Sequence, residues 1–111
     1  LVTPKGQSSL VAKISSEGDV LWVAQNMGEP SCMVHEITAD AKGRVWVSEW
    51  DAGQVGMYDP AANAWREWKL PGSRPQAYAV YVDEQDDVWL TDFGGNAIHR
   101  FDLETLKFET F

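Results

Sequence analysis

The sequence predicts an all-β chain: a β-propeller segment of about two and a half four-stranded antiparallel blades, part of a longer propeller or of an oligomeric assembly. Residues 37–68 and 80–111 align without a gap at an offset of 43 residues. Each copy holds four short apolar runs, separated by turns rich in Gly, Pro, Asn and Asp. A repeat of about 40–45 residues with four strands is typical of a propeller blade.

The two copies match in chemical character at nearly every apolar position. The clearest matched pairs are Val45 with Val88, Trp46 with Trp89, Tyr58 with Phe101, and Trp65 with Phe108. A sandwich of the same strands is the structural alternative, but the repeat would then serve no geometric purpose.

Strands are predicted at residues 35–40, 44–49, 54–58 and 64–69 in the first copy, and at 78–83, 87–92, 97–101 and 107–111 in the second. A weaker, partial copy precedes them, with strands expected at 9–14 and 19–23. The predicted units are therefore a partial blade and linker at 1–34, a complete blade at 35–77 and a second complete blade at 78–111. Blades that do not close into a ring expose apolar faces, so we expect self-association.

Composition excludes several classes of partner. The net charge is −8 and no basic run is visible, so a nucleic-acid partner is not expected. No apolar stretch approaches the length of a membrane-spanning helix, so no membrane partner is expected either. Cys32 is the single cysteine, which leaves no intrachain disulfide. Both ends look cut from something longer, and the compartment stays open between cytoplasm and periplasm.

The predicted pairing of strands within each hairpin brings residues with catalytic or metal-binding side chains together. Counting outward from the turn at Lys42 places His35 opposite Glu49, and the same count in the second copy places Tyr78 opposite Asp92. A histidine beside a carboxylate has the make-up of a general base, and carboxylate oxygens are ligands that Mg²⁺ and Ca²⁺ take.

The predicted site therefore lies at one mouth of a central channel. His35 and Glu49 are its catalytic candidates, and Glu49 and Asp92 are its metal-ligand candidates. A small-molecule ligand would contact Trp50, Tyr78 and Phe93 there.

Each of these residues also has a structural interpretation. His35 is expected to bond a loop carbonyl if it has no chemical role. Glu49 and Asp92 would cap turns or pair with an arginine such as Arg100, and Tyr78 would serve packing alone.

Residues outside the site have simpler expectations. His99 is expected to be exposed or at the edge of the core, and Trp46 and Trp89 to lie in the blade core. Asp59 and Asp102 are expected to begin turns. A nucleophilic pair of Cys32 with His35 has little support.

The segment from Val45 to Trp50, followed by residues 54–60, resembles the blades of the virginiamycin B lyase (streptogramin B lyase) family, and so does its copy from Val88 to Phe93 followed by 96–102. The resemblance implies a bacterial closed propeller that opens the streptogramin B ring by elimination. It implies a histidine base, and a Mg²⁺ held by glutamate and histidine. On this resemblance His35 would be the base or a metal-side ligand, and Glu49 would hold Mg²⁺.

The chain departs from that family pattern at several points. Val34 replaces a proline, and Met33 stands where a further acid is expected. Tyr78 and Asp92 replace the histidine and glutamate in the second copy. Full-length members of the family also have several more blades, so we expect the isolated segment, with half of the site missing, to be inactive alone. The alternatives are a non-catalytic propeller module that binds a protein or small molecule, and a metal-dependent lactone hydrolase.

Overall fold

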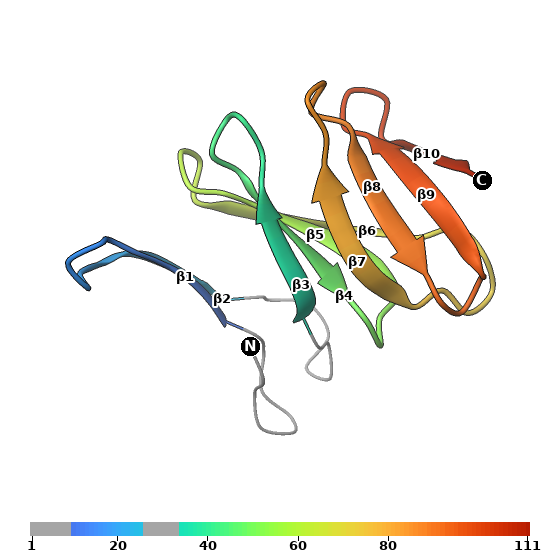
Figure 1. Ribbon diagram of the computed structural model, residues 1–111, viewed down its shortest axis with the longest axis horizontal. Helices are drawn as coiled ribbons and strands as arrows, with labels where there is room; N and C mark the ends of the chain where they lie inside the picture. Colours follow the sequence, from blue (N-terminus) through green and yellow to red (C-terminus); the bar gives the residue numbers. More distant parts are fainter. Residues whose placement is uncertain (1–9, 26–33) are drawn as a thin grey trace.

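The described part of the chain consists of β-strands joined by short turns. The computed structural model describes residues 10–25 and 34–111 (Figure 1). Within these ranges, ten strands form one two-stranded and two four-stranded sheets, all of them antiparallel. The same residues include no helix with the length and apolar character needed to cross a membrane.

The two four-stranded sheets are the two copies of the repeat. The first sheet contains β3 (Val34–Ala39), β4 (Val45–Glu49), β5 (Gln54–Asp59) and β6 (Ala64–Lys69). The second contains β7 (Ala77–Val82), β8 (Val88–Asp92), β9 (Ala97–Asp102) and β10 (Lys107–Thr110). Sequence neighbours pair in order, and each predicted strand of the two copies lies within one residue of an observed one.

A separate hairpin precedes them. It is formed by β1 (Leu10–Ile14) and β2 (Val20–Gln25), close to the two strands predicted there. The linker predicted between this hairpin and β3 falls largely on residues 26–33, outside the described ranges.

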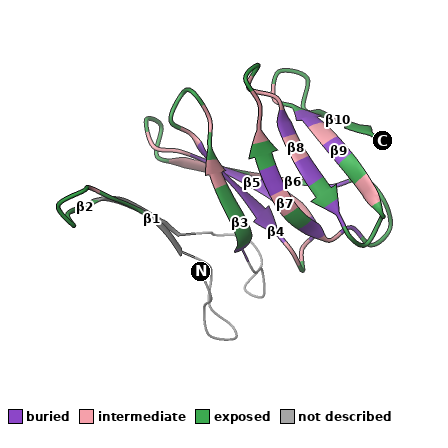
Figure 2. Cartoon of the chain, in the orientation of Figure 1, coloured by how far each residue is buried: buried purple, intermediate pink, exposed green. Residues whose placement is uncertain are grey.

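The main core lies between the two four-stranded sheets. The first sheet contributes Trp46, Val55 and Met57, and the second contributes Ala77, Val80, Val88, Leu90 and Phe101. Figure 1 shows β7 beside β3 and β4, so the inner strands of the two sheets meet. β4 is buried along its whole length (Figure 2), as expected for a strand with a neighbour on each side and a sheet over its face.

A repeated Asp–Trp pair closes the first hairpin of each sheet. The Oδ2 atoms of Asp40 and Asp83 accept hydrogen bonds from the indole Nε1 of Trp46 and Trp89, at 2.9 and 2.8 Å. The bond from Trp89 is the main reason that the pKa of Asp83 lies below its ordinary value. This bond explains why the Asp and the Trp recur together, six residues apart.

The prediction that Trp89 lies in the core like Trp46 is wrong for this chain. Trp46 is buried between the sheets, whereas Trp89 is half-buried on the outer face of the β7–β10 sheet. The two tryptophans occupy equivalent positions, but no described sheet covers the second one.

The linker between the sheets is held against the β4–β5 turn. Leu70 is buried and its N–H donates to the carbonyl of Gly53 at 2.9 Å. Gly53 has a φ of 63°, and a Cβ there would overlap the carbonyl of Pro75. Only glycine fits this crossing, which sets where β7 begins.

Candidate functional site

Four rings gather at one end of the two sheets. They come from equivalent positions of the repeat: His35 and Tyr78 near the start of the inner strands, Trp50 and Phe93 directly after the second strands. The His35 and Tyr78 centroids lie 4.2 Å apart, and those of Tyr78 and Phe93 lie 4.9 Å apart. Trp50 completes the cluster, 5.6 Å from Phe93 and 5.7 Å from Tyr78. We call these four residues the aromatic rim.

The imidazole of His35 is held in one tautomer. Its Nδ1 lies 2.9 Å from the backbone carbonyl of Tyr78, and the side chain is exposed. A carbonyl oxygen only accepts hydrogen bonds, so Nδ1 carries the proton and Nε2 of the neutral ring carries the lone pair. The acceptor is a carbonyl of strand β7, where the structural interpretation expected a loop. The bond orients the ring and leaves Nε2 with the capacity to take a proton.

The same carbonyl anchors a second side chain. The Ser48 hydroxyl donates to the Tyr78 oxygen at 2.8 Å and accepts from the N–H of Glu36 at 3.0 Å. His35 and Ser48 therefore lie on the same face of the β3–β6 sheet, the face toward β7.

The predicted pairing of His35 with Glu49 is wrong by one residue. A bulge between Val34 and Glu36 places Val34 opposite Glu49. Ser48 and Glu49 are consecutive strand residues, so their side chains point to opposite faces. Since His35 shares the face of Ser48, Glu49 points away from it. The second copy has the same shift, with Ala77 in place of Tyr78 opposite Asp92.

Glu49 lies inside the first sheet's packing. It is fully buried, and its Oε2 accepts from the Gln54 amide at 2.8 Å. Its other oxygen lies over Gly56, where an added Cβ would come within 2.7 Å of it. The glycine makes room for the carboxylate.

Asp92, the equivalent acid, anchors the second sheet. Its Oδ1 accepts from the backbone N–H groups of Gln76 and Gly95, at 2.8 and 2.9 Å. Its Oδ2 accepts from His99 Nε2 at 2.9 Å. Burial raises the pKa of Asp92, but these hydrogen bonds outweigh it, so that the pKa lies below its ordinary value. The bond to Gly95 agrees with the interpretation of Asp92 as a turn cap.

His99 departs from its expectation. It was predicted to be exposed or at the core edge, yet it is 2% exposed and bonds both Asp92 and the Thr110 hydroxyl, the latter at 2.9 Å. It occupies the position that Gly56 has in the first copy of the repeat. In the second sheet the shorter Asp92 therefore contacts a histidine, where in the first sheet the longer Glu49 lies over a glycine. Asp92 and His99 lie on the same face of the β8–β9 hairpin, diagonally across from one another, and this register was the signal that could have revealed the pair.

These contacts do not fit the predicted Mg²⁺ site. Magnesium prefers oxygen ligands in near-ideal octahedral geometry and usually keeps several water molecules as ligands. Both oxygens of Asp92 face N–H donors, and Glu49 is buried on the face opposite His35. Among residues 10–25 and 34–111, no three His, Cys, Asp or Glu side chains are grouped as a metal would require.

Solved structures place this architecture in a known class. The sheets, their order and their repeat are those of a β-propeller segment. The chain is similar to virginiamycin B lyase from Staphylococcus aureus, with 22% identity, a TM-score of 0.78, and coverage of 92% of this chain and 33% of that one. It is also similar to a catalytically inactive histidine-to-alanine form of that lyase with quinupristin (19%, TM-score 0.75, 99% of this chain and 43% of that one).

A protein of unknown function from Bacteroides caccae matches as well, at 16% identity and a TM-score of 0.71, over 94% of this chain and 38% of that one. The chain thus spans well under half the length of the solved chains it matches. No family model matches it, and no curated protein does. The predicted fold and the resemblance in structure are confirmed at this level.

Proposed function

We propose that the aromatic rim binds a cyclic ester of the streptogramin B type and that His35 is the base that opens it by elimination. The observation that carries the proposal is the fixed tautomer of His35, with a basic Nε2 on an exposed ring among three other rings. The structural similarity to virginiamycin B lyase, and to its inactive histidine variant with quinupristin, supports this choice of substrate class.

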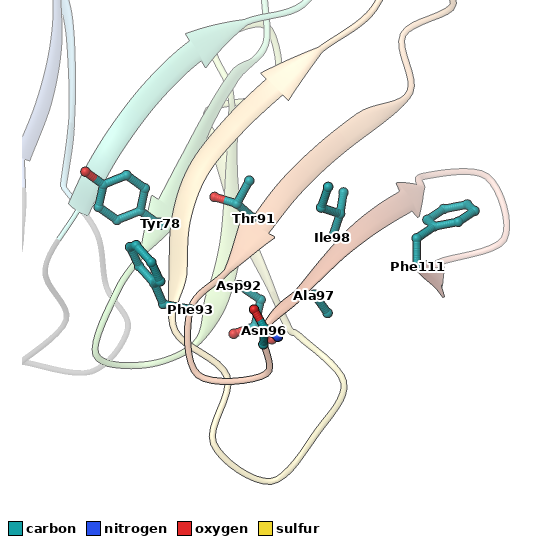
Figure 3. Close-up of a pocket in the computed structure, with 8 residues that line it drawn as sticks. All are labelled: Tyr78, Thr91, Asp92, Phe93, Asn96, Ala97, Ile98 and Phe111. Carbon is teal, nitrogen blue, oxygen red and sulfur yellow. The ribbon is translucent and has the colours of Figure 1, made fainter.

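The rim supplies the contact surface for such a ligand. Aromatic side chains give a large contact area with few rotatable bonds, which suits an apolar ring-shaped molecule. Phe93 is 63% exposed and Tyr78 is 39% exposed, so both rings offer area to a ligand. Figure 3 shows the Tyr78 and Phe93 rings lying close together, beside a hollow that both of them line.

The proposed step moves one proton and one electron pair. Nε2 of His35 takes a proton from the carbon next to a carbonyl. The pair left behind forms a carbon–carbon double bond, and the ester C–O bond on the neighbouring carbon breaks, so that the acyl part leaves as a carboxylate. No water is consumed. Because Glu49 and Asp92 do not fit a magnesium site, no part of this step is assigned to them.

Binding is tested by titrating the chain with quinupristin and following tryptophan fluorescence and heat. Replacement of Trp50 by Leu removes one rim ring and should weaken binding by roughly three- to tenfold, from the value of one aromatic contact. Tyr81→Leu is the matched control, since Tyr81 is exposed on β7 outside the rim. Equal affinities for both variants would contradict binding at the rim.

Because the isolated segment is expected to be inactive, chemistry is tested by mass spectrometry of the antibiotic after long incubation with a longer chain in which this segment is part of a closed propeller. Elimination opens the ring with no change in mass, whereas hydrolysis adds one water. The variant His35→Gln keeps an amide donor for the Tyr78 carbonyl but has no base, so it should retain binding and lose ring opening. A hydrated product would support the lactone hydrolase instead. Binding without any opened product would support the non-catalytic module.

A further inference from the structure

Two hydroxyl groups, those of Ser48 and Thr91, occupy equivalent positions in the two copies of the repeat and hold equivalent bulges. Ser48 Oγ accepts from the N–H of Glu36 at 3.0 Å, and Thr91 Oγ1 accepts from the N–H of Ala79 at 3.0 Å. Both N–H groups lie at the bulge of an inner strand, where the regular pairing is interrupted. A side-chain hydroxyl thus serves as the acceptor at each interruption.

The two bulges are joined to each other through one carbonyl group. The residue in the β3 bulge is His35, and its equivalent in the β7 bulge is Tyr78. The Tyr78 carbonyl oxygen lies 2.9 Å from His35 Nδ1 and accepts from the Ser48 hydroxyl at 2.8 Å. A carbonyl oxygen has two lone pairs and can accept both hydrogen bonds. The position of this oxygen therefore determines which nitrogen of the His35 ring carries the proton.

Ser48 holds this arrangement from the first sheet. It is 0% exposed, so water does not compete for its hydroxyl. The hydroxyl donates to the Tyr78 oxygen and accepts from the N–H of the peptide group directly after His35. Both ends of the bond between His35 and Tyr78 are thus tied to the same side chain, which couples the direction of the imidazole to the place of its acceptor.

Thr91 acts on the same carbonyl from the second sheet. It lies on β8, beside the strand that carries Tyr78 (Figure 3). The carbonyl of Tyr78 and the N–H of Ala79 belong to one peptide group, which bonds His35 at one end and Thr91 at the other. A peptide group is planar and rigid, so a hydrogen bond to its N–H also fixes the direction of its carbonyl oxygen. Thr91 therefore orients the acceptor of His35 across the width of β7.

We infer that Ser48 and Thr91 are positioning residues for His35: their hydroxyl groups hold the peptide groups at the two bulges so that the Tyr78 carbonyl keeps the imidazole proton on Nδ1. An unrestrained neutral histidine in water carries its proton mainly on Nε2, so the protein has to impose the tautomer with a free Nε2 lone pair. The use of this lone pair as the base of an elimination rests on the proposed function, whereas the placement of the proton does not.

Imidazole ¹⁵N spectra of the ligand-free chain, at a pH of about 9 where histidine side chains are ordinarily neutral, measure the tautomer directly. In the unmodified chain the His35 proton should reside on Nδ1. Thr91→Val keeps the shape of the side chain but offers no acceptor to Ala79, so it should lower the ratio of the Nδ1–H to the Nε2–H form roughly two- to tenfold, the value of one hydrogen bond. Ser48→Ala removes two hydrogen bonds and should lower the ratio at least as far. Thr91→Ser keeps a hydroxyl and should retain the wild-type ratio.

Thr38→Val is the matched control, because it makes the same replacement on β3 where the pairing is regular. It should leave the His35 tautomer unchanged. His99 provides an internal reference: its Nε2 faces Asp92 at 2.9 Å, so its proton should stay on Nε2 in every variant as long as the second sheet is folded.

A wild-type His35 with its proton on Nε2, or a shift in Thr38→Val as large as that in Thr91→Val, would overturn the inference. An unchanged tautomer in Ser48→Ala or in Thr91→Val would overturn the role of that residue. Should Ser48→Ala not fold, the comparison of Thr91→Val with Thr91→Ser, at an exposed position, still decides the matter. A shifted tautomer, with no ring opening by the longer chain, would support the positioning role and contradict only the role of His35 as a base.

Discussion

Removal of the Asp92 side chain should destabilise the second sheet far more than removal of the partly exposed Asp87 carboxylate. Three N–H groups donate to the Asp92 carboxylate: those of Gln76, Gly95 and the His99 ring. In Asp92→Ala all three lose their acceptor in a site where the acid is 3% exposed. Asp92→Asn changes far less, because an amide oxygen still accepts from both backbone groups.

The magnitudes follow from the bonding. An unsatisfied buried donor costs about 1–3 kcal/mol, so three of them, partly reached by water, should cost about 3–5 kcal/mol. In Asp92→Asn the new amide N–H would face the His99 Nε2–H. The ring can relieve that clash by moving its proton to Nδ1, which then donates to the Thr110 oxygen. What Asp92→Asn then loses is the strengthening that the carboxylate charge gives to these hydrogen bonds, about 1–2 kcal/mol of the free energy of unfolding.

Urea unfolding at a fixed protein concentration measures these differences. Asp87→Ala serves as the control, because Asp87 lies 3.8 Å from Arg100 at a partly exposed site and should change the free energy of unfolding by no more than about 0.5 kcal/mol. Imidazole ¹⁵N spectra report the tautomer: the His99 proton should reside on Nε2 in the wild type and on Nδ1 in Asp92→Asn.

An Asp92→Ala variant that loses no more stability than Asp87→Ala, or a His99 tautomer that is the same in wild type and Asp92→Asn, would contradict the assigned role of Asp92. Should Asp92→Ala not fold at all, the Asn variant and its tautomer still decide the matter.

Two further predictions concern pH and the linker. Asp92 and Asp102 have pKa values below the ordinary 3.8 in the folded chain, Asp92 because its hydrogen bonds outweigh burial and Asp102 because of backbone N–H donors. The stabilisation by these two ionised carboxylates is thus complete above pH 3.8 and is lost as the pH falls through their folded pKa values. The free energy of unfolding, measured at a series of pH values, should therefore decline below pH 3.8, and the decline should be shallower in Asp92→Asn. Separately, Gly53→Ala should lower the melting temperature markedly more than Gly43→Ala. Both glycines have a positive φ, which costs a non-glycine residue about 1–2 kcal/mol. Only at Gly53 would the added Cβ also overlap the Pro75 carbonyl. Equal losses would contradict the assigned role of the linker.

Much of the fold could be predicted because the repeat shows twice where each strand lies. Apolar alternation and turn residues located the strands to within one residue in both copies. The same logic brought Trp50 and Phe93 together with the inner strands, since strands of equivalent hairpins end on the same side.

The site was harder to predict because it depends on register and on neighbour size. The bulge before Glu36 moves Glu49 to the face opposite His35, and no residue type in this segment marks a bulge. The burial of His99 depends on the space beside a shorter acid, which strand patterning does not encode. For these reasons the aromatic rim was predictable, whereas the contacts of the two carboxylates were not.

Glu49 lies over Gly56 in the first sheet, and the shorter Asp92 bonds the larger His99 in the second, so the length of the acid matches the size of the residue seven positions later in both sheets. A chimera that transplanted the strand ending in Glu49 into the second sheet would force the longer acid against the imidazole, while the reverse graft would leave an empty space above the glycine. Anyone who shuffles blades of this type should therefore cut the chain outside this hairpin and move both of its strands together.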